Sequence, residues 1–126
     1  MKKLPDAEFE VMRAVWSLRL PVTSAAVGEC LRRTLPDRDW KPQTILTMLT
    51  RLEQKGFLHS EKAGKERLYD VRVSETDYMQ VEADSLRQRF AGGHFSGLMR
   101  ALCDTGDLTD EDIAALQKLL DERRNT

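Results

Sequence analysis

The chain has few of the residues that build disulfide frameworks and metal sites, because its 126 residues include two cysteines and two histidines. Cys30 and Cys103 lie far apart without a partner pattern, which favours a reducing cytoplasm over a disulfide framework. His59 and His94 are equally isolated and lack the spacing of metal ligands. No apolar run approaches the ~20 residues that a membrane span requires. No apolar segment follows the N-terminal lysines either, so a signal peptide is not predicted.

Catalytic motifs are also missing. The most conspicuous group of carboxylates is an acidic run near the C-terminus: Asp104, Asp107, Asp110, Glu111 and Asp112. No histidine, glycine-rich loop or nucleophile elbow accompanies it. Negative charge is favourable in the first turn of a helix, and this explains the last three of these residues. We therefore expect neither a hydrolase nor another enzyme, and we predict no cofactor and no bound metal.

The net charge of −1 is divided unequally along the chain. Residues 1–73 hold fourteen Lys and Arg against ten Asp and Glu, whereas residues 74–126 hold six against eleven. The first segment therefore carries +4 and the second carries −5. Such an asymmetry indicates a partner for the basic half, and an acidic half would be held away from phosphate.

Residues 42–54 predict an amphipathic helix, with Pro42 in its first turn and Gly56 just beyond its end. Apolar residues at helical spacing form one face: Ile45, Met48, Leu49 and Leu52. Polar residues cluster on the opposite face: Gln43, Thr47, Thr50, Arg51 and Gln54. Side chains of these types hydrogen-bond to base edges and phosphate oxygens in a major groove. The periodicity by itself favours an ordinary amphipathic surface helix over a DNA-binding helix.

The residues that follow favour the DNA-binding interpretation. Two extended runs, residues 57–63 and 65–73, flank Gly64 and predict a β-hairpin. Alternating residues of the second run can lie on a core: Tyr69, Val71 and Val73. The hairpin tip is basic: Lys62, Lys65 and Arg67. A helix, a glycine and a basic hairpin in this order are typical of a winged helix-turn-helix domain, which we assign to residues 1–73.

Two further helices precede this segment. Asp6 is expected to cap the first, which runs to about Leu18 and buries one face: Phe9, Met12, Val15 and Trp16. Thr23 or Ser24 is expected to cap the second, which ends at Pro36. On that helix Cys30 is expected to be a small buried hydrophobe. Trp40 is expected to anchor the start of the third helix in the core, and not to stack on a base.

Residues 74–126 predict three more helices, separated by Gly92 and Gly93 and by Thr109, which forms a capping box with Asp112. Some 50 residues bury too little apolar surface to be stable alone. We therefore predict a two-fold dimer, with these contacts: Tyr78, Val81, Phe90, Phe95, Leu98, Met99, Leu102, Ile113, Leu116 and Leu120. The predicted fold is mainly α with a small β-hairpin, a winged helix-turn-helix DNA-binding domain followed by a three-helix C-terminal dimerisation domain.

Four stretches together resemble the penicillinase-repressor family of the BlaI/MecI type: EFEVMRAVW, DWKPQTILTMLTRLEQKGFL, GGHFSGLMRAL and LTDEDIAALQKLL. The resemblance covers nearly the whole chain. It implies a homodimeric cytoplasmic repressor that binds an inverted-repeat operator in double-stranded DNA and regulates genes such as those of β-lactam resistance. It also implies a membrane sensor-protease that cleaves the repressor in the second of the three helices predicted for residues 74–126. The matching bond is Ala101–Leu102, where the family often has Asn and Phe.

Groove contacts are expected from Thr44, Thr47 and Arg51, with Gln43 beside them in place of a lysine common in the family. Arg51 can pair bidentately with guanine or hold a phosphate. Contacts to the DNA backbone are expected from Lys41, which stands where the family often has Ser, and from Lys65 and Arg67 on the wing.

Two other functions are compatible with the sequence. A metal-responsive repressor of the related CopY type ends in a cysteine cluster, whereas this chain ends in DERRNT and Cys103 stands alone. A winged helix can also serve as a protein-binding module. Binding to the promoter region of the chain's own gene distinguishes that module from a repressor.

Overall fold

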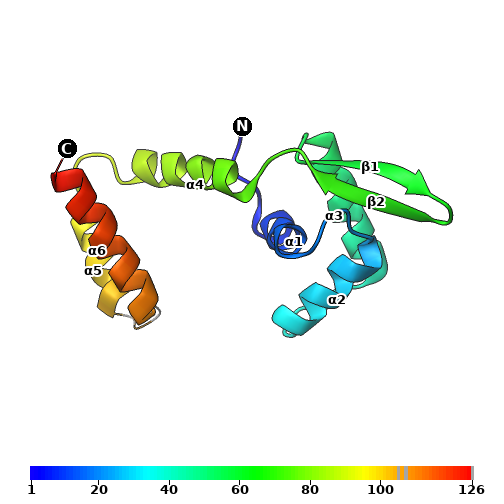
Figure 1. The fold of residues 1–126 in the computed structure, drawn as a ribbon, viewed down its shortest axis with the longest axis horizontal. Coiled ribbons are helices and arrows are strands. Elements are labelled where there is room, and N and C mark those ends of the chain that lie inside the picture. Colours follow the sequence, from blue (N-terminus) through cyan, green and yellow to red (C-terminus); the bar gives the residue numbers. More distant parts are fainter. Residues whose placement is uncertain (105, 107, 126) are drawn as a thin grey trace. The chain divides into compact units, whose positions relative to one another are not determined.

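The computed structural model describes residues 1–104, 106 and 108–125, and the chain divides into two compact units. The N-terminal unit is Met1–Ser85 and the C-terminal unit is Leu86–Thr126. The elements follow one another as α1 (Asp6–Ser17), α2 (Ser24–Thr34), α3 (Pro42–Gln54), β1 (Leu58–Ala63), β2 (Glu66–Val71), α4 (Glu75–Arg89), α5 (Phe95–Asp104) and α6 (Asp110–Arg124) (Figure 1). The predicted fold class, mainly helical with a small hairpin, is confirmed.

Asp107 of the acidic run lies outside the described residues. Within residues 1–104, 106 and 108–125, no helix is both long enough and apolar enough to cross a membrane.

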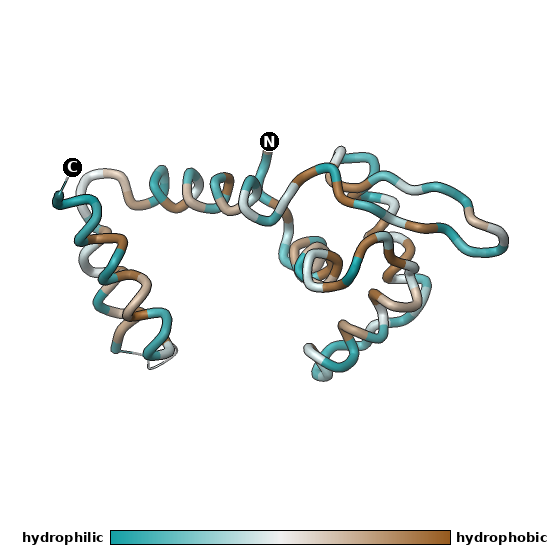
Figure 2. The backbone as a smooth tube through the Cα atoms, viewed as in Figure 1, coloured by the Kyte–Doolittle hydropathy of each residue, from teal (hydrophilic) through white to brown (hydrophobic). Residues whose placement is uncertain are grey.

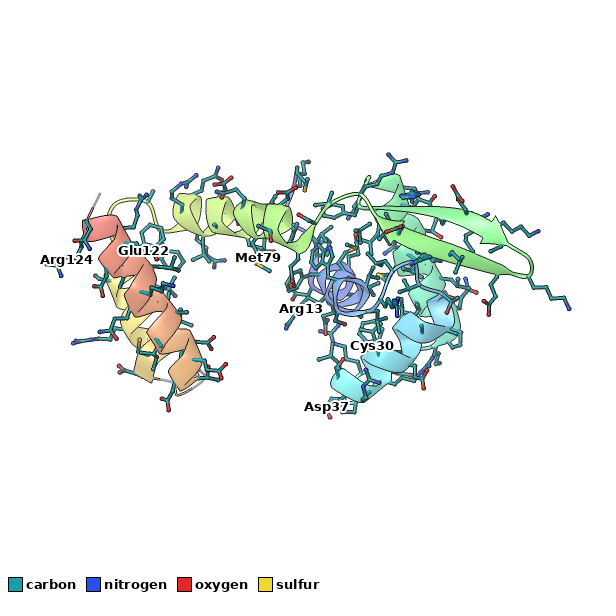
Figure 3. All side chains as sticks on the ribbon, viewed as in Figure 1. Arg13, Cys30, Asp37, Met79, Glu122 and Arg124 are labelled. Carbon is teal, nitrogen blue, oxygen red and sulfur yellow. The ribbon has the colours of Figure 1, made fainter. Side chains whose placement is uncertain are left out.

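The core of the N-terminal unit is built by α1, α2, α3 and the hairpin. Met12 and Val15 of α1 are fully buried, as their spacing predicts, while Phe9 and Trp16 pack against the core from its edge. The predictions for Cys30 and Trp40 are confirmed, because both side chains lie in this core. Figure 3 labels Cys30 on α2.

Of the two predicted helix N-caps, the structure contradicts the one for α1 and confirms the one for α2. The cap predicted at Asp6 is wrong: Asp6 is the first residue of α1, and the cap residue is Pro5, which makes no side-chain hydrogen bond. Thr23 caps α2 as predicted, since its Oγ1 accepts a hydrogen bond of 3.2 Å from the Ala26 N–H.

The predicted hairpin is present, with β1 and β2 paired antiparallel from Leu58 opposite Val71 to Ala63 opposite Glu66. Gly64 and Lys65 form the two-residue turn, and Gly64 has a φ of +66°, as the first central residue of a type II′ turn requires. Val22, which precedes α2, adds a bridge at the edge of β2, where Val22 and Tyr69 exchange two backbone hydrogen bonds of 2.9 and 2.7 Å. The hairpin extends away from the three helices (Figure 1).

The first turns of α4 belong to the core of the N-terminal unit. Tyr78 is fully buried, and its ring lies 5.6–5.7 Å from the rings of Phe9, Trp16 and Phe57. The Tyr78 hydroxyl accepts a hydrogen bond of 2.7 Å from the Leu4 N–H and donates one of 2.6 Å to a Glu82 oxygen. The boundary between the units therefore falls between Ser85 and Leu86, later than the predicted boundary after residue 73.

This placement corrects the assignment of Tyr78 to a dimer interface. A side chain with no exposed surface in one chain has none left to bury against a second. Val81 is also packed in part against the same core.

Tyr78 predicts a loss of stability at alkaline pH. Burial raises its pKa to about 12 from the ordinary 10, and the hydrogen bond to Glu82 acts in the same direction. Between pH 10 and 12 the Tyr78 hydroxyl therefore stays protonated in the folded state, whereas it loses its proton in the unfolded state. The resulting stability is fully present below pH 10 and is lost as the pH rises through 12, at about 1.4 kcal/mol per pH unit between these values.

We expect the free energy of unfolding, measured with denaturant, to be lower at pH 11 than at pH 8 in the native chain. In Tyr78→Phe the decrease between these two pH values should be smaller. At pH 8 the variant should be less stable by about 1–3 kcal/mol, because the buried Leu4 N–H loses its acceptor. The contribution of Tyr69, whose pKa burial also raises, is common to both chains and cancels in the comparison. An equal loss in both chains would contradict the prediction.

The C-terminal unit has no buried residue in its two helices: none in α5 and none in α6, both of which the structure describes throughout. The predicted helix boundaries are confirmed: Gly92 and Gly93 have φ values of +97° and +98°, and Thr109 and Asp112 form the capping box. Hydrophobic residues recur along both helices (Figure 2). Seven large apolar side chains on them are at least 38% exposed: Phe95, Met99, Leu102, Ile113, Leu116, Leu119 and Leu120.

Candidate nucleic-acid interface

Close packing and a backbone anchor fix the start of α3. Gly28 of α2 faces Ile45 so closely that a Cβ added to Gly28 would lie 2.7 Å from the Ile45 Cδ1 atom. Any larger residue at Gly28 would therefore require the Ile45 side chain to shift. The Arg32 guanidinium donates hydrogen bonds of 3.1 and 2.8 Å to the carbonyl oxygen of Trp40, which holds the chain just before α3.

The end of α3 is fixed by a Schellman motif. Gly56 has a φ of +85°, the Gly56 N–H donates to the Glu53 carbonyl and the Phe57 N–H donates to the Leu52 carbonyl. Lys55 adds an ion pair with the buried carboxylate of Glu8 in α1. With both ends held, α3 presents its outer side as a rigid surface.

The outer side of α3 carries a shallow hollow of about 300 Å³, and the six residues that line it are here called the recognition face: Gln43, Leu46, Thr47, Thr50, Arg51 and Gln54. The predicted polar face is thus present, opposite the buried Ile45, Leu49 and Leu52. The one acidic residue of α3, Glu53, is turned toward the hairpin, where it accepts a hydrogen bond of 2.6 Å from the Ser60 hydroxyl. The recognition face therefore carries a cation, two amides and no carboxylate.

The threonine hydroxyls of this face already donate to the helix itself. Thr47 Oγ1 donates a hydrogen bond of 2.9 Å to the Gln43 carbonyl, and Thr50 Oγ1 donates one of 2.9 Å to the Leu46 carbonyl. Such bonds between a threonine and the carbonyl four residues earlier use the hydroxyl hydrogen and leave the oxygen as an acceptor.

Two predicted contact residues lie at the beginning of α3. Thr44 is exposed but does not line the hollow. Lys41 is the cap residue of α3 without a side-chain cap, and its exposed ammonium lies 3.7 Å from an Asp39 oxygen. Exposed pairs of this kind contribute little to stability, so a phosphate can replace the carboxylate at small cost.

The hairpin, here called the wing, is tied to α3 by a short chain of hydrogen bonds. Arg67 Nη1 donates to the Ser60 hydroxyl over 2.9 Å, and Ser60 in turn donates to Glu53. Arg67 is thereby held on the side of the wing nearest α3, while Lys65 stands in the exposed turn. Figure 3 shows side chains reaching outward from the wing tip.

A second hollow, of about 380 Å³, lies where the start of α2, the recognition face and the wing meet. It is lined by Thr23, Ser24, Ala25, Leu46, Lys65, Glu66, Arg67 and Tyr69. The free N–H groups at a helix start favour anions, and two cations of the wing border the same space. Leu46 lines both hollows, so Lys65 and Arg67 of the wing border the space beside one edge of the recognition face.

Leu46 and the start of α2 also border the site, and neither was predicted from the sequence. Helical spacing places Leu46 between Gln43 and Thr50, so its position was available, but an apolar residue is not expected on a polar face. The start of α2 enters the site only through the tertiary packing of α2 beside the wing.

Comparisons with known proteins identify the chain. The family model described as penicillinase repressor matches residues 4–122. The chain belongs to this family. The penicillinase repressor of Bacillus licheniformis is 34% identical over 128 residues, which span 99% of this chain and 97% of that protein. The methicillin resistance regulatory protein MecI of Staphylococcus aureus strain N315 is 27% identical, over 96% of this chain and 95% of its own length.

A solved relative agrees with the N-terminal fold of this penicillinase-repressor family member. The solution structure of the DNA-binding domain of the repressor BlaI matches with a TM-score of 0.50 and 38% identity, over 62% of this chain and 94% of that domain. The family member is thus a DNA-binding transcriptional repressor with a winged helix, and it is not an enzyme. Among residues 1–104, 106 and 108–125, no three His, Cys, Asp or Glu side chains are grouped so as to hold a metal ion.

Proposed function

We propose that the repressor binds an inverted-repeat operator as a homodimer, with α3 in the major groove and the wing on the phosphate backbone. The observation that carries this proposal is the acid-free recognition face beside the wing cations. Gln43 and Arg51 supply donors for base edges, whereas Lys41, Lys65 and Arg67 supply charge for phosphates.

The exposed apolar residues of α5 and α6 support the dimer. Seven large exposed apolar side chains on two helices are more than a monomer surface usually carries, and such surfaces mark interaction sites. The simplest partner for this apolar surface is a second copy of the same chain. A dimer places two winged helices one duplex turn apart, which matches a palindromic site. We assign the interface to these side chains: Phe90, Phe95, Leu98, Met99, Leu102, Ile113, Leu116, Leu119 and Leu120. Phe90 and Phe95 already face each other, with ring centroids 6.3 Å apart.

Proteolysis in α5 would explain release from the operator. Ala101 and Leu102 are exposed but lie within the helix Phe95–Asp104, so a protease must unwind the helix locally before it can cut. A cut at Ala101–Leu102 separates α6 from the rest of the interface and removes its apolar contacts. We propose a membrane sensor-protease as the partner, and β-lactam-resistance genes as the targets, because relatives are named for penicillinase and methicillin resistance.

The salt dependence of binding tests the placement of the wing. The probe is a duplex selected by the protein from a random library of 30-base-pair DNA, and fluorescence anisotropy gives the affinity as a function of salt. Removing one phosphate contact lowers the slope of log K against log salt by about 0.9. Lys65→Ala and Arg67→Ala should therefore each lower the slope by roughly 1.8 in a dimer, and should weaken selected and random duplexes alike.

Lys118→Ala is the matched control, because it removes the same charge from α6 in the C-terminal unit. Its slope should equal that of the native chain. Slopes that are unchanged in both wing variants would remove the wing from the backbone contacts. Failure of the selection to enrich any duplex would overturn the proposed operator binding itself.

A further inference from the structure

We propose that the middle of α3 reads the C5-methyl groups of thymine through an apolar ridge formed by Leu46, Thr47 and Thr50. The inference rests on the proposed function, in which α3 lies in the major groove. It adds a determinant of sequence specificity, because it requires T·A pairs where the centre of each recognition helix meets its half-site.

Leu46 is the apolar residue of the recognition face. Its side chain is 39% exposed, whereas its neighbours Ile45 and Leu49 are buried in the core. An exposed leucine by itself is ordinary. This one lines both hollows of the site, between the amides of the recognition face and the cations of the wing. An apolar group at that position has little use for phosphates and suits an apolar group on a base.

Thr47 and Thr50 lie beside Leu46 and add two methyl groups to the same side of α3. Because the hydroxyl hydrogens of Thr47 and Thr50 bond to the Gln43 and Leu46 carbonyls, both donors are used within α3 and are turned away from a base edge. Each threonine offers a γ-methyl group and an oxygen that can accept. Thr50 follows Leu46 by four positions and Thr47 by three, so these residues are neighbours on one side of the helix. Together they form an apolar ridge without a hydrogen-bond donor.

The chemistry of the major groove identifies what this ridge can contact. The C5-methyl of thymine is the apolar group that base pairs present there, and threonine methyls and other apolar side chains pack against it. The amides of Gln43 and Gln54 lie on either side of the ridge along α3, and an amide pairs bidentately with adenine N6 and N7. Methyl groups in the middle and amides at the flanks therefore match a half-site whose centre is rich in T·A pairs.

The test replaces thymines of the selected duplex, one at a time, by deoxyuridine, which removes the methyl group and keeps every hydrogen-bonding atom. Burying one methyl group contributes about fourfold in affinity. We expect a loss of about fourfold per half-site at one to three thymines near its centre, and no loss at thymines outside the half-sites. Thermal unfolding of each variant below verifies that the fold is intact.

Protein variants remove the apolar groups that are proposed to contact the thymine methyl groups. Thr47→Ser and Thr50→Ser delete one methyl group and retain the hydroxyl, and Leu46→Ala deletes most of the apolar side chain. In each variant one deoxyuridine substitution should become neutral, which is the mark of a direct contact in a double-mutant cycle. Leu46→Met keeps an apolar side chain and should keep the sensitivity to deoxyuridine.

Outcomes separate the inference from the function on which it rests. A selected duplex whose affinity is insensitive to every deoxyuridine substitution overturns the ridge and leaves operator binding intact. Sensitivity that persists unchanged in Leu46→Ala, Thr47→Ser and Thr50→Ser assigns the methyl contact to other residues and also overturns it. If the selection enriches no duplex, the proposed function fails, and the ridge fails with it.

Discussion

Replacement of Arg51 by alanine should abolish the preference for the selected duplex while leaving the proposed dimer intact. The guanidinium is exposed on the recognition face, and the nearest acid along α3, Glu53, is engaged with Ser60. A bidentate contact to guanine contributes about 1–3 kcal/mol of discrimination. Two copies in a dimer therefore contribute about 2–6 kcal/mol, a loss of roughly 30-fold to 10⁴-fold. Anisotropy with selected and random duplexes measures the ratio, and sedimentation measures the assembly.

Arg51→Lys is the informative control, because lysine keeps the charge but lacks the planar fork of donors. If Arg51 pairs with guanine, the lysine variant should lose specificity nearly as far as the alanine variant. If Arg51 holds a phosphate, the lysine variant should retain most of the affinity. A footprint on the selected duplex that survives Arg51→Ala would refute both roles.

A charge placed on the apolar side of α6 should separate the dimer. Leu116 is 40% exposed in the single chain, and an aspartate there would bring two carboxylates into an apolar interface. We expect Leu116→Asp to sediment as a monomer at concentrations where the native chain is a dimer. The affinity for the two-half-site duplex should fall by about 10²–10⁴, because binding of the second half-site is no longer intramolecular.

Gln117→Asp introduces the same charge one residue away on α6 and should remain dimeric. Circular dichroism should show equal helix content in both variants, which excludes unfolding as the cause. A native chain that is monomeric in solution, or a Leu116→Asp chain that stays dimeric, would contradict the assigned interface.

The parts of the fold that were predicted from sequence depend on local signals. Pro42 and Gly56 bound α3, and Gly64 sets the turn of the wing, because each of these residues restricts or permits a particular backbone conformation whatever lies around it. The polar face of α3 was predicted for a similar reason, since helical periodicity decides which residues share a side.

The role of Tyr78 was not predictable in this way. In the sequence Tyr78, Val81 and Phe90 look like one sparse apolar stripe, and periodicity does not say which surface covers each residue. Only the packed structure shows Tyr78 enclosed by Phe9, Trp16 and Phe57.

The order of the elements, the winged-helix class and the cations that line the two hollows could be predicted from the amino-acid sequence. Tertiary structure decided that α4 begins inside the N-terminal core, that the start of α2 borders the wing, and that the hydroxyls of Thr47 and Thr50 are already committed. The physical reason is the range of the forces involved. Backbone preferences and periodicity act over a few residues, whereas burial and side-chain hydrogen bonding depend on partners that only folding brings near.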